Sequence, residues 1–280
     1  MRRDLVLSMM GPSQEELAAF LPQLESVTRR AGDIAMSYFR PGQRTSAKVS
    51  YKGGGSPVTE ADFAVDRFLY DEMARLAPEA AWLSEETVDT AERLSRERLI
   101  VLDPIDGTHA FTRGDDRWSV SIALVAKGRP VAGVIHAPAL GETYVGGRGL
   151  GAFLNGARLF APQRAEIAGA SFVAPRAMQE RLAASPQGFV MAPRTPSLAL
   201  RLADIASGRH DVVVAGPNAR DWDIAAADIL LAEAGARLSE PEGVALTYNR
   251  VSLARDMLIA APTSLFDESL ALARDVSKGK

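Results

Sequence analysis

The segment of residues 99–111, LIVLDPIDGTHAF, constrains the fold of this chain more than any other stretch. The four apolar residues at its start predict a short buried strand that ends at Asp103. Pro104 stops the strand from continuing, and Gly107 permits a tight backbone path close to a ligand. The turn is therefore expected to hold the carboxylates of Asp103 and Asp106 near each other.

Two neighbouring carboxylates repel each other unless a cation lies between them. Hard oxygen ligands favour Mg²⁺, which keeps several waters and is often completed by a substrate's phosphate. A surface turn of the D-P-x-D-G type uses the same residues without any ion. The segment alone leaves both interpretations open.

The composition is that of an ordinary globular enzyme, with 280 residues, 47% hydrophobic and 24% charged. The net charge is −3, and Lys and Arg are spread along the chain rather than clustered. This distribution does not indicate nucleic-acid binding. The chain has no cysteine, so disulfides and thiolate sites are excluded. No run approaches the roughly 18 apolar residues of a membrane helix, and the N-terminus makes a poor signal peptide. We therefore expect a cytoplasmic protein with neither nucleic-acid polymers nor membranes as partners.

Hydrophobic periodicity divides the chain into two lobes after a lead-in at residues 1–12. Residues 13–160 predict an α+β lobe, in which two helices precede an antiparallel meander of strands that accompanies the metal site. Residues 161–280 predict an α/β lobe, because strands and helices alternate there, and this lobe contributes Asp223. We expect the functional site between the lobes.

The N-terminal lobe carries further local expectations. Ser13, followed three residues later by Glu16, has the form of a capping box, and Pro22 marks either a kink or the true start of the helix. Residues 43–57 predict a mobile loop, because they are polar and contain three consecutive glycines. Residues 87–98 predict a solvated acidic linker.

Three other acidic residues stand at predicted strand ends or helix starts. Asp62 begins a helix, where its charge could merely complement the helix dipole. Glu85 follows an apolar segment but could equally be solvated, as Glu86 is expected to be. Asp223 precedes an apolar helix, where aspartate is a preferred N-cap. Together with the two turn aspartates, these residues supply the acids of a two-metal site, in which Mg²⁺ ions clamp a phosphoryl group and activate a water.

Residues other than acids add little to the candidate chemistry. Thr108, beside the turn, could orient the attacking water, with Asp62 accepting its proton. His109, His136 and His210 have no partner at metal-ligand spacing, so we expect structural or surface roles for them. His109 nevertheless lies close enough to the turn to touch a substrate.

With these residues in view, the chain resembles the inositol monophosphatase superfamily of Mg²⁺-dependent, lithium-sensitive phosphomonoesterases. The two signatures are DPIDGT at residues 103–108 and WDIAA at residues 222–226. PVTEAD at 57–62 and SEE at 84–86 support them in the family's order and separation, over roughly residues 15–270. The resemblance implies a layered α-β-α-β-α sandwich, of α+β or α/β class, and commonly a dimer.

The resemblance also implies a site that holds two or three Mg²⁺ ions. One ion would be bound by Glu85, Asp103 and the backbone carbonyl of Ile105. A second would be bound by Asp103, Asp106 and Asp223.

Roles for the attacking water and the phosphate follow from the same resemblance. Thr108, linked to Asp62, would position the water, and the backbone amides of Gly107 and Thr108 would receive the phosphate. Lys52 lies in the segment that corresponds to the family's mobile metal-binding loop. It would neutralise phosphate charge.

The substrate is where this sequence departs from the inositol-specific members. Those members carry a glutamate about seven residues before the metal-binding aspartate of the second signature, to bind sugar hydroxyls, and Gly216 stands there in this chain. Asp221 and residues 56–59 are more similar to bacterial 3′(2′),5′-bisphosphate nucleotidases, and Asp221 is then expected to contact the substrate. Inositol monophosphatase is the second candidate. Histidinol phosphatase, whose members share residues 137–141, is the third.

A different class of function is a degenerate member that only binds phosphate ligands, or a Ca²⁺-binding structural domain. Every matched metal-binding and water-positioning residue is intact, which argues against degeneracy. The spacing of Asp103 and Asp106 also does not fit an EF-hand. The sequence therefore predicts hydrolysis of a small phosphorylated metabolite by a metal-activated water, without a phosphoenzyme, in a homodimer.

Overall fold

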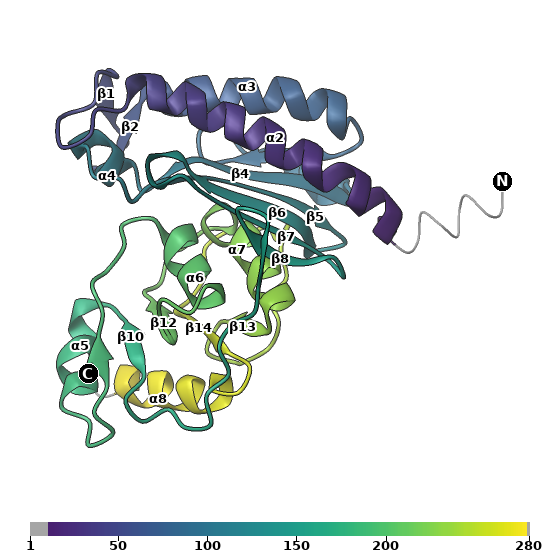
Figure 1. The fold of residues 1–280 in the computed structure, drawn as a ribbon. Coiled ribbons are helices and arrows are strands. Elements are labelled where there is room, and N and C mark those ends of the chain that lie inside the picture. The colour runs from purple at the N-terminus through teal and green to yellow at the C-terminus, as the bar shows by residue number, and fades with distance from the viewer. Residues whose placement is uncertain (1–10, 279–280) are drawn as a thin grey trace.

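The computed structural model describes residues 11–278, and these residues stack in five layers (Figure 1). The first ten residues of the predicted lead-in lie outside the described residues. Two helices, a seven-stranded sheet, two helices, a five-stranded sheet and two further helices follow one another through the molecule. This arrangement confirms the predicted α-β-α-β-α sandwich.

The first layer consists of the long helices α2 (Gln14–Tyr38) and α3 (Glu60–Leu76), which cover one face of the seven-stranded sheet. The strand order in that sheet follows the chain, from β3 to β9, with β3 parallel to β4 and every later pair antiparallel. Its strands are β3 (Ala81–Ser84), β4 (Arg98–Asp106), β5 (Ser119–Ala126), β6 (Arg129–Ala137), β7 (Glu142–Gly147), β8 (Gly151–Leu154) and β9 (Ala157–Leu159).

The middle helices α6 (Leu198–Ala206) and α7 (Asp221–Ala234) pack between the two sheets. The second sheet has the order β11-β10-β12-β14-β13, and α5 (Arg176–Ala183) and α8 (Phe266–Lys278) cover its outer face. Its strands are β10 (Ser171–Val173), β11 (Val190–Met191), β12 (Val212–Ala215), β13 (Ala236–Ser239) and β14 (Leu258–Pro262).

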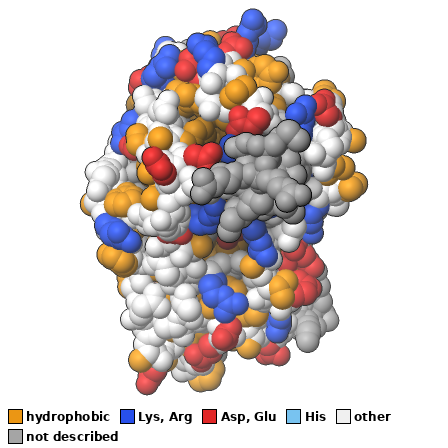
Figure 2. All heavy atoms as spheres, turned by 90° about the vertical axis from the view of Figure 1, so that its right-hand side faces the viewer, with side chains coloured by type: hydrophobic (Ala, Val, Ile, Leu, Met, Phe, Trp, Pro, Cys, Tyr) orange, Lys and Arg blue, Asp and Glu red, His pale blue; other side chains and the backbone are white. Residues whose placement is uncertain are grey.

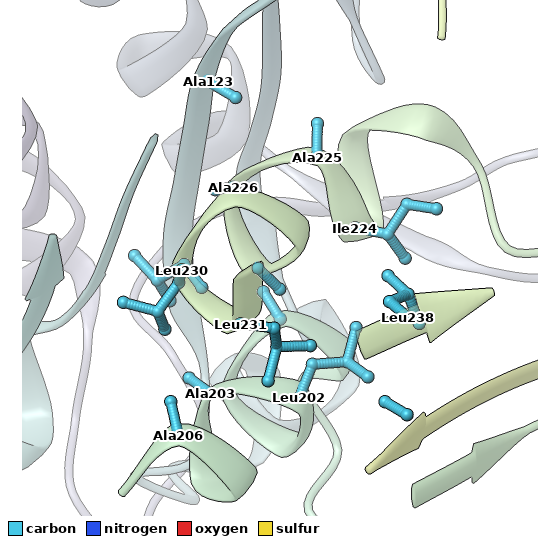
Figure 3. Packing of buried hydrophobic residues seen from close by; sticks show 14 of the residues in the cluster. Ala123, Leu202, Ala203, Ala206, Ile224, Ala225, Ala226, Leu230, Leu231 and Leu238 are labelled. Atoms are coloured by element: carbon cyan, nitrogen blue, oxygen red, sulfur yellow. The ribbon is translucent and has the colours of Figure 1, made fainter. Parts of the chain in front are cut away.

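Helix α7 is apolar around nearly its whole circumference, because sheets lie on both sides of it. Figure 3 shows Leu231 of α7 next to Leu202 and Ala203 of α6, and Ile224 of α7 next to Leu238 of β13. A helix that is hydrophobic on all faces belongs in a core. The core of the middle layer therefore joins elements from both halves of the chain.

Several local expectations can be compared with the structure. The capping box of Ser13 and Glu16 is confirmed, whereas Pro22 lies inside one continuous helix rather than at its start. The predicted loop at residues 43–57 overlaps a short hairpin that the sequence did not reveal, formed by β1 (Val49–Tyr51) and β2 (Pro57–Thr59).

The predicted acidic linker also needs correction. Residues 87–98 include the short 3₁₀ helix η1 (Ala91–Ser95), and Arg93 within it is buried. The guanidinium of Arg93 pairs with Asp89 and donates to the side chain of Asn249. A second 3₁₀ helix, η2 (Pro138–Leu140), and the short helix α4 (Thr108–Arg113) complete the elements.

The surface carries charges of both signs. Figure 2 shows one face, on which basic and acidic side chains are interspersed among neutral ones. Among the described residues, no helix is both long and apolar enough to cross a membrane.

Two glycines let α7 lie close to the seven-stranded sheet. A Cβ atom on Gly133 of β6 would come within 2.8 Å of the Ala226 Cα atom, and one on Gly146 of β7 within 2.9 Å of the Leu230 Cα atom. A side chain at either position would push the helix off the sheet. The close approach matters for function, because the first turn of α7 carries Asp223.

We predict that Gly133→Ala lowers the free energy of unfolding by about 1–3 kcal/mol, because the added methyl group overpacks the contact with Ala226. Urea unfolding followed by circular dichroism measures the change. Gly54→Ala is the matched control, since a Cβ atom there meets nothing within 4 Å. Equal stabilities of the Gly133 and Gly54 variants would contradict the packing argument.

Candidate metal centre

The end of β4 presents two aspartates on one side of the strand. Side chains normally alternate along a strand, so residues three apart point to opposite faces. Here Asp103 pairs with Ser121 and Asp106 with Ser119, which leaves one extra residue on β4. Such an irregularity re-aims side chains. It allows both carboxylates to face the same site.

The Asp106 carboxylate lies at the N-terminus of α6. It accepts hydrogen bonds from the Ser197 hydroxyl at 2.5 Å, from the Leu198 amide at 3.2 Å and from the Ala199 amide at 2.7 Å. Ser197 is also the N-cap of α6, since its oxygen accepts from the Leu200 amide. The N-terminal donors of a helix favour a negative charge, so α6 orients this carboxylate.

Asp223 comes from the first turn of α7, and its carboxylate accepts a hydrogen bond of 2.6 Å from the backbone N–H of Arg220. Carboxylate oxygens of Asp103, Asp106 and Asp223 all lie within 4.8 Å of one another. The structure thus brings together three acids that are up to 120 residues apart in sequence.

The electrostatics of this cluster are unfavourable without a cation. Burial raises the pKa of Asp103 well above its usual range, and the charges of Glu85, Asp106 and Asp223 raise it further. Burial, followed by the Asp106 charge, likewise raises the pKa of Asp223 well above its usual range. The pKa of Asp106 is also raised by burial, against the opposing effect of its hydrogen bonds with α6.

Glu85 lies beside this cluster because of the pairing between β3 and β4. Ser84 pairs with Leu102, and the Glu85 amide donates to the Leu102 carbonyl, so Glu85 lies next to Asp103. Its carboxylate accepts from the Lys52 ammonium at 2.8 Å.

Lys52 links the hairpin segment to two glutamates, since its ammonium also donates to Glu86 at 2.7 Å. Burial lowers the pKa of Lys52, but its hydrogen bonds with Glu85 and Glu86 outweigh that effect, and the pKa is raised overall. Glu86, which the sequence suggested to be solvated, has a side chain only 4% exposed. Burial raises its pKa to about 7.

Asp62 and Thr108 occupy separate hydrogen-bond networks. The Asp62 Oδ2 atom accepts from the backbone N–H of Thr59 at 2.8 Å and from the Thr59 hydroxyl at 2.6 Å. The Thr108 hydroxyl donates to the Ile105 carbonyl at 3.0 Å. Burial raises the pKa of Asp62 to about 6, with Glu85 contributing. The link between Thr108 and Asp62 stays a prediction.

Asp221 does not lie where a substrate contact requires it. Its side chain is fully buried and paired with Arg255 at 2.5 Å, and its other oxygen accepts from the backbone N–H of Asn249 at 3.1 Å. Both oxygens are therefore occupied by a structural network that holds residues 249–255 against the start of α7. Asp221 is therefore not available for the substrate contact that the sequence predicted.

A cavity of about 430 Å³ opens over the acidic cluster. Its lining residues come from both halves of the chain: Ser56, Pro57, Glu85, Asp103, Ile105, Asp106, Gly107, Thr108, His109, Arg194, Pro196 and Asp223. Gly216 instead lines a separate cavity of about 470 Å³, with Pro175 and Met257. Gly216, which stands where inositol-specific members carry a glutamate, thus lies outside the acidic cavity.

The donor set fits a hard divalent cation. The cluster offers carboxylate oxygens, and Asp103 and Asp106 are buried, so their mutual repulsion is not screened by water. Oxygen-only ligands of this kind suit Mg²⁺, which tolerates open positions filled by water or phosphate.

Comparisons with known proteins agree with this geometry. The model of the inositol monophosphatase family matches residues 15–278. This chain belongs to the inositol monophosphatase family. A 3′(2′),5′-bisphosphate nucleotidase of Aggregatibacter actinomycetemcomitans is 30% identical over 82% of this chain and 87% of its own length. An inositol-1-monophosphatase of Mesorhizobium japonicum is 36% identical over 72% of this chain and 79% of its own length.

A solved structure is also similar. An inositol monophosphatase of Thermotoga maritima superimposes with a TM-score of 0.80 at 27% identity, covering 92% of this chain and 98% of the other. The chain is therefore a phosphatase of this superfamily, and the family is metal-dependent.

Sequence reasoning missed two residues of this site. Ser197 was recognisable as a helix N-cap, but its bond to Asp106 spans 91 residues and has no local signal. Arg194, which lines the cavity, lies in a segment for which the sequence suggested no role.

We predict that Asp103→Asn stabilises the protein in the presence of a metal chelator. The folded-state pKa of Asp103 is raised, so the native state binds more protons, and the contribution of Asp103 lowers stability as pH rises above about 4. At pH 8 the variant should exceed the wild type in unfolding free energy, whereas at pH 4 the two proteins should be nearly equally stable. Urea titrations at both pH values measure the difference.

The matched control for this measurement is Asp71→Asn, an exposed residue of α3. This variant should leave the stability nearly unchanged at both pH values. A wild-type protein as stable as Asp103→Asn at pH 8 would contradict the inferred charge repulsion.

Proposed function

We propose that this protein is a Mg²⁺-dependent phosphomonoesterase that hydrolyses a small phosphorylated metabolite with a water as nucleophile. The observation that carries the proposal is the convergence of Asp103, Asp106 and Asp223 at the base of one cavity. Three carboxylates within 4.8 Å of one another, two of them buried and the third half-buried, are a costly arrangement that a divalent cation relieves.

The ligands follow the family's matched positions. Glu85, Asp103 and the Ile105 carbonyl would hold one ion, and the three aspartates a second, in a site of two or three ions. When bound, Mg²⁺ would supply charge neutralisation for the phosphate and lower the pKa of a bound water. Lys52 would leave Glu85 and balance phosphate charge from the mobile hairpin segment.

The chain's own residues position and deprotonate the attacking water. Asp62, with a pKa raised to about 6 by burial, is suited to accept a proton near neutral pH. Thr108 would orient the water once its hydroxyl turns from Ile105 towards Asp62. The backbone amides of Gly107 and Thr108, whose residues line the cavity, would receive the phosphate.

For the substrate, we propose a 3′(2′),5′-bisphosphate nucleotide first. Similarity to bisphosphate nucleotidases supports this choice. Gly216 no longer supports it, because this residue lines a separate cavity. Asp221 no longer supports it, because it is buried. Inositol 1-phosphate is the second candidate, on the similarity to inositol-1-monophosphatase, and histidinol phosphate the third.

Three further properties complete the proposal. We propose a homodimer and inhibition by Li⁺, both supported by the family resemblance. We also propose a cytoplasmic location, as expected from the sequence.

We predict that the purified protein releases phosphate in a Mg²⁺-dependent manner and that Asp106→Asn abolishes the release. The test measures phosphate from adenosine 3′,5′-bisphosphate, inositol 1-phosphate, histidinol phosphate and fructose 1,6-bisphosphate, each with and without Li⁺. Asp71→Asn, which makes the same chemical change on an exposed helix face, should retain full activity. Near-normal turnover by Asp106→Asn at saturating Mg²⁺ would overturn the metal assignment.

We predict that Thr108→Ala lowers kcat by about 10²-fold or more while KM changes little, because Thr108 would act on the water rather than on the bound ester. Steady-state kinetics on the preferred substrate separate the two constants. Thr108→Ser, which keeps the hydroxyl, should restore much of the turnover. A change confined to KM would remove the water-positioning role.

A further inference from the structure

The segment of residues 192–197 forms one wall of the acidic cavity and is firmly held. The Thr195 carbonyl accepts from the guanidinium of Arg201 at 3.1 Å, and the Thr195 hydroxyl accepts from Arg117 at 3.2 Å. Arg201 also donates to the Pro196 carbonyl at 3.4 Å. Thr195 and Arg201 are both buried, so these bonds fix the backbone of the segment.

Arg194 extends from this fixed segment into the cavity lining. Its side chain is exposed, and within residues 11–278 no hydrogen bond or ion pair holds its guanidinium. Of the other cations near the cavity, Lys52 pairs with Glu85 and Arg201 donates to backbone carbonyls. Arg194 thus combines a fixed backbone with a guanidinium that is available to a ligand.

The charges around Arg194 favour an anion at this point. Burial, followed by the nearby positive charge of Arg194, lowers the pKa of Arg201 to about 10, against the opposing effect of the charges of Asp106 and Asp223. Two positive guanidinium groups repel each other, and an anion beside Arg194 relieves that repulsion. The planar fork of a guanidinium also binds phosphate or carboxylate through two parallel hydrogen bonds.

The acids of the cavity do not supply this anion. Two divalent cations would balance the four carboxylates of Glu85, Asp103, Asp106 and Asp223, and the metal centre would hold the phosphate that is cleaved. The charge of Arg194 is then left to a second group on the substrate. A neutral polyol would leave it unused.

We propose that Arg194 binds a second anionic group of the substrate, a phosphate or carboxylate apart from the phosphate that is cleaved. Arg194 therefore selects phosphate monoesters with two anionic groups over phosphates of neutral polyols. This inference rests on the proposed phosphatase function and extends it to substrate specificity.

The first test compares two classes of substrate. Arg194→Gln should lower kcat/KM for adenosine 3′,5′-bisphosphate and for fructose 1,6-bisphosphate by about tenfold or more relative to kcat/KM for inositol 1-phosphate. The loss should appear mainly in KM, because Arg194 holds a group that does not react. Arg67→Gln, an equal change on the exposed face of α3 and outside the cavity lining, should leave the ratio unchanged.

The second test measures binding while turnover is slow. In a Thr108→Ala background at fixed Mg²⁺, which keeps the metal ligands, calorimetry should show tighter binding of adenosine 3′,5′-bisphosphate than of adenosine 3′-monophosphate. Adding Arg194→Gln should remove most of that difference. Adding Arg67→Gln should preserve it.

Two outcomes would overturn the inference while leaving the phosphatase function intact. One is an equal loss of kcat/KM for all three substrates in Arg194→Gln, and the other is a wild-type enzyme that prefers inositol 1-phosphate. Absence of phosphate release by the wild-type protein from every substrate would instead contradict the proposed function itself.

Discussion

Repulsion among the carboxylates of Asp103, Asp106 and Asp223 is the constraint on which the rest of this site depends. An ordinary fold avoids buried like charges, because no solvent screens them. Here the irregular end of β4 and the first turn of α7 direct them at one another. The N-terminal donors of α6 offset part of the cost at Asp106. The remaining cost is the reason to infer a cation, since an ion of two positive charges converts the repulsion into attraction.

The middle layer of helices links the stability of the fold to this site. Helices α6 and α7 fill the space between the two sheets with alanine and leucine side chains. The N-termini of both helices lie at the acidic cavity. Glycines on β6 and β7 bring α7 close to the sheet and thereby set the position of Asp223. A packing change far from the cavity should therefore alter the metal ligands as well as the stability.

Local patterns in the sequence predicted the features that depend on neighbouring residues. The turn after residue 102, the capping box at Ser13 and the alternation of strands all have short-range signals. Pairings between distant residues do not, and there the predictions failed or were lacking. Asp221 was expected at the substrate, but Arg255, 34 residues later, buries it. The bond of Ser197 to Asp106 and the burial of Glu86 by Lys52 likewise depend on tertiary packing.

The central claim is that the three aspartates form a divalent-cation site, and anomalous X-ray diffraction from crystals grown with Mn²⁺ tests it most directly. Mn²⁺ favours the same oxygen ligands as Mg²⁺ and gives a strong anomalous signal. We expect an anomalous peak bounded by oxygens of Asp103, Asp106 and Asp223, which should disappear in crystals of Asp106→Asn. A map at saturating Mn²⁺ with no peak at this cluster would contradict the claim.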